Sequence, residues 1–529
     1  MTSRFVRALP AILAALLATS NATAFAATAP SPLARRVAQI VGRPELRHTQ
    51  IGVAFYDLDS KRLVYGLNER KYFLAASTTK TLTEGTALAL LGGDFRFTTP
   101  VYRTGPIGAD GTLDGDLVLK AGGDPDLSNR IEPNATLAFE NEDHSYDGSP
   151  DTKAVPGDPL QVLRELARAI AAKGIKRVSG RVVVDSTLFP EGAHEAGTGV
   201  VVSPIVVNDN IVDVTVTPGA KAGDPVSIAV SPQTAYVRFV NRATTAAAGS
   251  DRTIDLSDDV ADANGERTVT IAGTLPQASP SILYAYDVPS PRRFAEVALT
   301  EALQDAGVAI AMPGADAPAD ASKLAAFYTD ANVVAVHTSP PLREDVRITL
   351  KVSDNLHADL MPYVWAVYKA HASANYLRTA FAMEKAFLRG GGLDPQDFIQ
   401  NDGLGTNAFY QPAVMVRYLE FLRAQPFFAD FYDGLPILGV DGTLFNIQNG
   451  TPGAGKVHAK TGTWGAGDRL NDRSVITSKG LAGYMTTAGG RHLAFALYLN
   501  NLPVEHGKDA ARTAGQVLGE LANAAYSNL

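Results

Sequence analysis

Residues 73–83, Phe-Leu-Ala-Ala-Ser-Thr-Thr-Lys-Thr-Leu-Thr, decide how the rest of the chain is interpreted. They contain a Ser-x-x-Lys motif formed by Ser77 and Lys80, the only one in the sequence. On a helix, residues three apart lie on one face with their Cβ atoms about 5–6 Å apart, so the lysine amine can reach the serine hydroxyl. Apolar residues on both sides, at 73–76 and 87–91, predict that this helix is buried in a core.

A serine needs such a neighbour to act as a nucleophile. Its hydroxyl reacts poorly until a base takes its proton. A lysine can be that base when burial or a nearby cation lowers its pKa from about 10.4 towards neutral. The motif alone is weak evidence, because about one Ser-x-x-Lys is expected by chance in a chain of this composition.

A second motif, Ser353-Asp-Asn355, follows the run 347–352, which we expect to be a strand, and precedes a helical pattern. The hydroxyl of Ser353 is placed to relay a proton between the first-motif lysine and a leaving amine, and Asn355 to hold a substrate amide. A second Ser-x-Asn occurs at 373–375, inside a helical pattern that spans 355–389. We interpret that copy as part of a solvated helix face.

The third motif is Lys-Thr-Gly-Thr at residues 460–463, in a predicted strand. The cation of Lys460 and the hydroxyls of Thr461 and Thr463 suit an anionic carboxylate. The absence of a side chain at Gly462 lets a ligand backbone approach closely. The backbone N–H of Thr463 and that of the first-motif serine are candidates for an oxyanion hole.

The three motifs together, in this order, are far more specific than any one of them. Ser-x-x-Lys, Ser-Asp-Asn and Lys-Thr-Gly are the signature of β-lactamases and penicillin-binding proteins. Ser77 and Ser353 are 276 residues apart, which is far more than a β-lactamase needs. The chain therefore resembles the class C low-molecular-weight penicillin-binding proteins, D-alanyl-D-alanine carboxypeptidases/endopeptidases with domains inserted between the first two motifs. Other segments similar to this family are 121–126, 208–210, 401–405, 435–444 and 499–501.

The resemblance implies an α+β serine transpeptidase-like core, in which helices flank an antiparallel sheet. It also implies that Ser77 attacks the D-Ala–D-Ala carbonyl of peptidoglycan peptides and is the residue acylated by β-lactams. Lys80 is then the base, Ser353 and Asn355 assist, and residues 460–463 bind the terminal carboxylate. The chemistry that the resemblance implies uses no cofactor and no metal.

The sequence departs from the family pattern in several places. Ala75 stands where the family usually has proline, and His357-Ala-Asp359 replaces the usual Ala-Glu after the second motif. Residues 404, 406 and 407 also differ, and Ala408 replaces an arginine that in relatives helps to hold the free carboxylate of a diaminopimelate side chain. Two alternative functions stay open: a serine β-lactamase, which uses the same serine, and a catalytically silent peptidoglycan-binding relative, which the altered 402–408 segment favours.

A chain of 529 residues is too long for one core, so we expect several domains. We predict a catalytic domain from 33–97 plus 339–529, interrupted by an inserted module at 98–338 that is rich in short strands. A β-rich domain nested at about 205–288 fits within that module. The polar stretch 138–158 is predicted to be a loop, and Asp124 and Asp126 within the insert are expected to be turn residues.

Residues 1–26 have the pattern of a cleavable signal peptide. Arg4 and Arg7 precede a short apolar run at 9–17, and Ala24-Phe-Ala26 is a small-x-small cleavage site. We predict an exported, periplasmic or secreted protein whose mature chain has no transmembrane anchor. The absence of cysteine excludes disulfides, thiol catalysis and thiolate metal sites.

Composition argues against other partners. The formal net charge of −8, without an evident basic face, makes nucleic acid an unsuitable ligand. The nine histidines form no His-Glu-x-x-His motif. Residues 450–456 nearly match a phosphate-binding loop, but Val457 stands where a serine or threonine must hold magnesium, so we predict a hairpin turn there.

Overall fold

The computed structural model describes residues 30–529 except 144–149, 264, 313 and 315–319. The predicted signal peptide, residues 1–26, lies outside the described residues. Within the described ranges, no helix is both long enough and apolar enough to cross a membrane.

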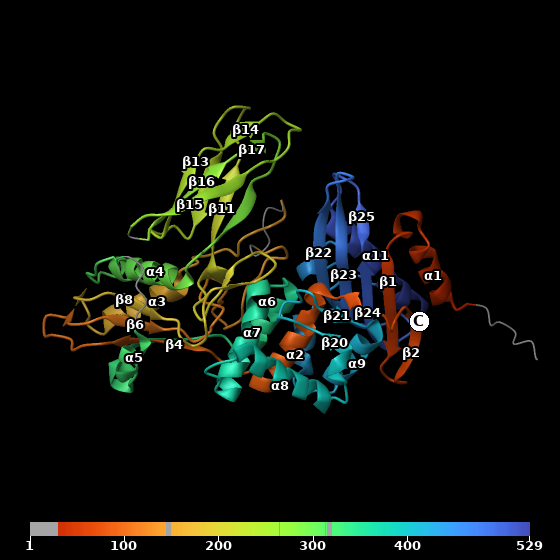
Figure 1. The fold of residues 1–529 in the computed structure, drawn as a ribbon, viewed down its shortest axis with the longest axis horizontal. Coiled ribbons are helices and arrows are strands. Elements are labelled where there is room, and N and C mark those ends of the chain that lie inside the picture. Colours follow the sequence, from red (N-terminus) through yellow and green to blue (C-terminus); the bar gives the residue numbers. More distant parts are fainter. Residues whose placement is uncertain (1–29, 144–149, 264, 313, 315–319) are drawn as a thin grey trace, which may run out of the picture.

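A six-stranded antiparallel sheet lies towards one end of the molecule, on the right in Figure 1, with the main strand order β2-β1-β24-β23-β22 and with β25 paired to β23. Side chains alternate between its two faces because the period of a strand is two. In β1, Val53 and Phe55 point to one buried core, whereas Ala54 and Tyr56 point to the other. The strands are β1 (Gln50–Asp57), β2 (Arg62–Leu67), β22 (Val457–Asp468), β23 (Arg473–Thr486), β24 (His492–Asn500) and β25 (Leu502–Val504).

Helices cover both faces of this sheet. One face packs against α1 (Pro32–Val41) and α11 (Ala510–Asn528). The other packs against a group of helices that lies between the sheet and the residues of the predicted insert (Figure 1). The predicted α+β core is therefore confirmed. These helices are α2 (Lys80–Leu91), α6 (Leu342–Lys351), α7 (Asn355–Ala370), α8 (Tyr376–Gly390), α9 (Pro412–Arg423) and α10 (Phe428–Gly434).

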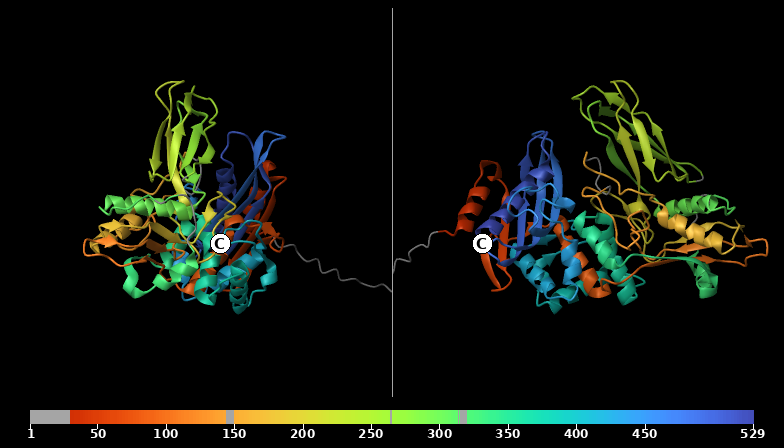
Figure 2. Two further views of the ribbon diagram at one scale, coloured as in Figure 1. Left: turned by 60° about the vertical axis from the view of Figure 1, so that its left-hand side comes forward. Right: turned by 180° about the vertical axis from the view of Figure 1, so that it is seen from behind.

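The stretch between the first two motifs leaves and re-enters the core at one place, because its first strand, β4 (Thr98–Arg103), pairs with its last, β19 (Val333–Thr338). The other strands of this four-stranded sheet are β6 (Leu117–Lys120) and β8 (Val182–Asp185), and helices α3 (Gln161–Ala172) and α4 (Pro291–Asp305) pack in the same core. Strands between 211 and 287 form further small sheets that project from the molecule (Figures 1 and 2). We propose that 98–338 is the inserted module and that the part nested at about 205–288 includes these strands.

Two local predictions next to the second motif are wrong. Residues 347–352 do not form a strand, because 342–351 are helix α6: Glu344 and Asp345 lie in its first turn, and Val346 and Leu350 are buried one turn apart. The pattern at 355–389 is not one helix. It divides at His371 and Asn375, both in the left-handed conformation, so the second Ser-x-Asn lies in the connection between α7 and α8.

Candidate active site

Ser77 lies in a tight turn that leads into helix α2. Residues 76–79 form a 3₁₀ turn, and the α-helix predicted across the motif begins only at Lys80. Ala76, immediately before the serine, has φ +48°, a left-handed conformation that costs a residue with a side chain about 1–3 kcal/mol. The hydrogen bond from the N–H of Ala75 to the carbonyl of Ala408, 2.8 Å long, helps to hold this turn.

The amine of Lys80 joins the first two motifs. It is fully buried and lies 3.2 Å from Ser77 Oγ and 3.1 Å from Ser353 Oγ. It also donates to the backbone carbonyl of Ser353 at 2.7 Å and to Asn355 Oδ1 at 2.5 Å. Two motifs 276 residues apart in the sequence thus meet around one nitrogen.

Burial prepares this lysine to act as a base. Desolvation disfavours the charged ammonium and lowers the pKa of Lys80 to about 8, against the opposing effect of the carboxylates of Asp354 and Glu195. About half of the amine is therefore neutral at pH 8, and about a tenth at pH 7. Burial and the charge of Lys80 also lower the pKa of Lys460 well below its usual value.

Ser353 occupies a strained turn between α6 and α7. Its φ is +64°, again left-handed. Asp354 caps α7 by accepting the N–H of His357 at 3.0 Å, which fixes the start of the helix. The cap and the bond from Lys80 to the Ser353 carbonyl hold the Ser353 hydroxyl next to the amine.

The third motif lies on β22, the edge strand that runs beside the Ser77 turn. Lys460 is buried and donates to the carbonyl of Thr461 at 3.0 Å. A Cβ at Gly462 would lie 2.6 Å from the carbonyl oxygen of Ala75 and 3.1 Å from the Ser77 nitrogen. Gly462 is therefore required by the close approach of strand and turn, rather than by the ligand contact expected from the sequence.

Gly462→Ala is expected to lower the rate of Ser77 acylation by about 100-fold, because displacing reacting groups by about 1 Å has effects of that size. The added methyl group must push β22 away from the Ser77 turn. The measurement is the acylation rate with a fluorescent penicillin. Gly467→Ala is the matched control, since a Cβ at Gly467, on the same strand, meets nothing within 4 Å. Equal rates for the two variants would contradict this account of Gly462.

A cavity of about 890 Å³ opens in front of the three motifs. Its walls come from both the core and the insert. Gly197 of the insert lies so close to Asn355 that a Cβ there would be 2.0 Å from the amide nitrogen. The insert therefore forms one wall of the site. The residues of the predicted motifs that line the cavity are Ser77, Ser353, Asp354, Asn355, Thr461, Gly462 and Thr463.

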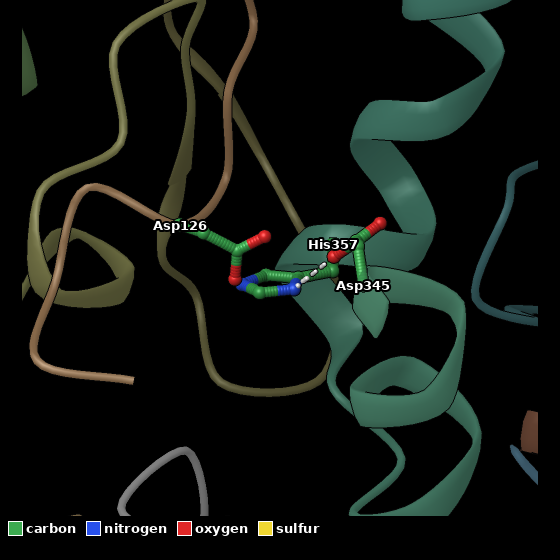
Figure 3. A group of neighbouring side chains, drawn as sticks. All are labelled: Asp126, Asp345 and His357. Carbon is green, nitrogen blue, oxygen red and sulfur yellow. Dashed lines mark hydrogen bonds and ion pairs between the residues drawn. The ribbon is translucent and has the colours of Figure 1, made fainter. Parts of the chain in front are cut away.

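A buried ionic network lies behind the second motif. The two ring nitrogens of His357 lie 2.8 Å from Asp345 Oδ1 and 3.1 Å from Asp209 Oδ1 (Figure 3 shows the Asp345 side). Asp209 also pairs at 2.7 Å with Arg130, which binds Asp143. Asp209 and Arg130 come from the insert, whereas His357 and Asp345 come from α7 and α6, so the network joins the insert to the core.

The network also brings together groups that can ligate a metal. Asp126, Asp345 and His357, and likewise Asp209, Asp354 and His357, place one ligand atom each within 4.8 Å of one another. However, both ring nitrogens face carboxylates, which raise the pKa of His357 well above its usual value despite burial. An imidazolium has no lone pair for a metal, so these residues fit an ion-paired cluster instead.

Sequence reasoning missed this network. Asp124 and Asp126 do form a turn, with the N–H of Asp126 donating to Asp124 Oδ1 at 3.0 Å. They are nevertheless buried, and desolvation raises the pKa of Asp124 to about 7. The available signal was His357, which departs from the family pattern directly after the second motif.

Comparisons with known proteins support the family resemblance inferred from the motifs. The model of the D-Ala-D-Ala carboxypeptidase 3 (S13) family matches residues 33–523. A D-alanyl-D-alanine carboxypeptidase from Actinomadura sp. is 28% identical over 480 residues, which cover 86% of this chain and 81% of the relative. The D-alanyl-D-alanine carboxypeptidase DacB of Haemophilus influenzae is 23% identical over 473 residues, 85% of each chain.

The fold is also similar to a solved structure. The crystal structure of penicillin binding protein 4 (dacB) from Haemophilus influenzae superposes with a TM-score of 0.68 at 22% identity, covering 93% of this chain and 99% of that one. The same protein in complex with a β-lactam gives a TM-score of 0.65. The resemblance inferred from three short motifs is confirmed over nearly the whole length of the described chain.

Proposed function

This chain belongs to the D-Ala-D-Ala carboxypeptidase 3 (S13) family, and on that premise we propose that it cleaves the terminal D-Ala–D-Ala bond of peptidoglycan stem peptides through an acyl-enzyme at Ser77. One observation carries the assignment of residues: a buried amine of lowered pKa lies within hydrogen-bonding reach of two serine hydroxyls, and both hydroxyls belong to residues that line the same cavity.

Acylation begins with the neutral amine of Lys80. The carbonyl oxygens of Ser353 and Asn355 can only accept hydrogen bonds, so they take the two N–H donors of a neutral amine. The nitrogen lone pair then remains for the hydroxyl of Ser77. As the Ser77 oxygen attacks the peptide carbonyl, its proton passes to Lys80.

The leaving group needs a proton in return. Ser353 Oγ lies 3.1 Å from the amine of Lys80, so it accepts a proton from the new ammonium and passes its own to the departing D-alanine nitrogen. The C–N bond breaks and the Ser77 ester remains. Water then attacks the ester, with Lys80 again accepting the proton, and the Ser77 hydroxyl is regenerated.

The substrate is positioned by β22 and by Asn355. The N–H groups of Ser77 and Thr463 are the proposed oxyanion hole, since β22 approaches the Ser77 turn closely at Gly462. The hydroxyls of Thr461 and Thr463 receive the terminal carboxylate, and Asn355 holds a peptide amide. Lys460 is buried behind them, and its amine donates to the carbonyl of Thr461.

The chemistry suits the periplasm or cell surface, where peptidoglycan is located. The predicted signal peptide and the lack of cysteine support export, and we propose a periplasmic or secreted enzyme. β-Lactams, which resemble the substrate, are proposed to acylate the same serine; a relative of this fold has been solved with such a compound bound.

Two measurements test the function together. The purified protein is expected to release D-alanine from an acyl-D-Ala-D-Ala peptide and to form a long-lived adduct with labelled penicillin, and Ser77→Ala is expected to lose both activities. Rapid turnover of penicillin without release of D-alanine would instead support the β-lactamase alternative. Neither release nor adduct in the folded wild-type protein would support the silent binding protein.

A further inference from the structure

Lys479 is a cation at the edge of the active-site cavity that none of the three motifs includes. It lies on β23, directly opposite Thr463 of β22 in the strand register. Its stem passes helix α11 close to Gly515, and its amine reaches Thr463 Oγ1 at 2.7 Å. Lys479 lines the same cavity as Ser77 and the residues of the third motif.

This amine is buried without a matching anion. Only 9% of the surface of Lys479 is exposed, and Thr463 provides its hydrogen-bond acceptor. Among the described residues, no carboxylate forms an ion pair with it. Asp509 and Glu142 are near enough to raise its pKa, but burial outweighs them and lowers the pKa to about 8. An ammonium has three donors, so two remain for a ligand.

A buried cation with free donors beside a substrate cavity is suited to an anion. Burying an unpaired charge is unfavourable, and an anionic ligand at this point removes much of that cost. The same anion must also lie within reach of the Thr463 hydroxyl, because that hydroxyl is hydrogen-bonded to the Lys479 amine. In a D-Ala–D-Ala peptide, the charged group next to the scissile bond is the α-carboxylate of the last residue.

We propose that Lys479, together with Thr463, binds the free α-carboxylate of the C-terminal D-alanine and so makes the enzyme selective for peptides that end in a free carboxylate. The proposal rests on the function proposed above and adds to it the residue that recognises the charge. Lys460 has a different place: its amine is fully buried, donates to the Thr461 carbonyl and does not line the cavity.

The test compares kcat/KM for an acyl-D-Ala-D-Ala peptide with that for the same peptide capped as a C-terminal amide. A charge-assisted hydrogen bond in a buried site contributes about 10- to 100-fold to such a preference. Lys479→Met is expected to reduce the carboxylate-to-amide ratio by that factor. The fall is expected in kcat/KM for the peptide with the free carboxylate, whereas kcat/KM for the amide stays the same. Lys479→Arg is expected to restore most of the ratio, since arginine keeps the charge.

Lys456→Met is the matched control, because Lys456 is exposed and lies just before β22. Its ratio is expected to equal that of the wild type. An unchanged ratio in folded Lys479→Met, with an active wild type, would overturn the role of Lys479 while leaving the proposed function intact. An inactive wild type that also fails to bind penicillin would instead overturn the proposed function.

A pH measurement on the wild-type protein keeps the proposal testable if the methionine variant does not fold. Both substrates use the same base, so the effect of Lys80 cancels in their ratio. The ratio is expected to fall as the pH rises through about 8, where Lys479 loses its proton. The titratable groups facing this amine are Asp509, Glu142 and Lys460. A ratio that is constant from pH 6 to 10 contradicts the proposal.

Discussion

Lys80→Met lowers the rate of Ser77 acylation by about 10²- to 10⁴-fold, the range by which a positioned general base accelerates proton transfer. Methionine has a similar length and fills the same buried space, but it has no lone pair that can take the serine proton. The measurement is the second-order rate of adduct formation with a labelled penicillin, with thermal melting as the check on folding. Lys71→Met is the control, because Lys71 is exposed in the segment just before the Ser77 turn.

The same residue sets the pH dependence of the wild-type enzyme. Because the base must be neutral and burial lowers the pKa of Lys80 to about 8, the acylation rate rises with pH below 8 and levels off above it. Lys80→Met is expected to lack this increase of the acylation rate with pH. A rate for Lys80→Met within threefold of the wild type, with the same pH profile, would show that another group removes the proton.

Replacement of His357 has the second large effect, on stability. Its imidazolium lies between the buried carboxylates of Asp345 and Asp209, and removing one partner of a buried ion pair costs about 3–5 kcal/mol. His357→Leu is expected to lower the free energy of unfolding by this amount, measured by denaturant unfolding. His357→Gln is expected to lose less, because its amide still forms a hydrogen bond. His506→Gln, at an exposed histidine, serves as the control.

The direction in which the free energy of unfolding changes with pH follows from the raised pKa of His357. A group whose pKa is higher in the folded state stabilises the protein fully below its unfolded pKa of about 6.5, and this contribution is lost as the pH rises through the folded value. The stability difference between wild type and His357→Leu is therefore expected to be largest at pH 6 and to shrink at alkaline pH. A difference below 1 kcal/mol at pH 6 contradicts the ion-paired account.

The α+β core and the meeting of the three motifs could be predicted because three short motifs, visible in the sequence, carry the resemblance to a family with that fold. Residues 50–57 and 492–500 are nearly continuous apolar runs, as expected of strands buried on both faces, and the structure pairs them as β1 and β24. The motifs identify the groups that need one another chemically. The helical structure of residues 347–352 was harder to predict. Their apolar positions alternate as in a strand, but in α6 Leu350 packs in one core cluster and Ile348 and Val352 in another, so the helix is buried on two faces. The acidic first turn of α6 was the signal for the helix.

The rest of the site depends on contacts that no local pattern encodes. Lys479 matters because its strand register places it opposite Thr463, and that register becomes visible only when β22 and β23 pair. His357 matters because Asp209 and Arg130 arrive from the insert, more than 140 residues earlier in the chain. Both side chains are important because they are ionisable and buried. Burial depends on the folded chain, so it could not be predicted from the sequence around either residue.

The most direct test of the central claim is to locate the covalent adduct after incubation with a penicillin. Trypsin releases residues 72–80, Tyr-Phe-Leu-Ala-Ala-Ser-Thr-Thr-Lys, as a single peptide that contains Ser77. The account predicts that this peptide gains the mass of the penicillin, that fragmentation places the added mass on Ser77 and that Ser77→Ala gains nothing. An adduct on another peptide, or no adduct in the folded wild-type protein, would contradict it.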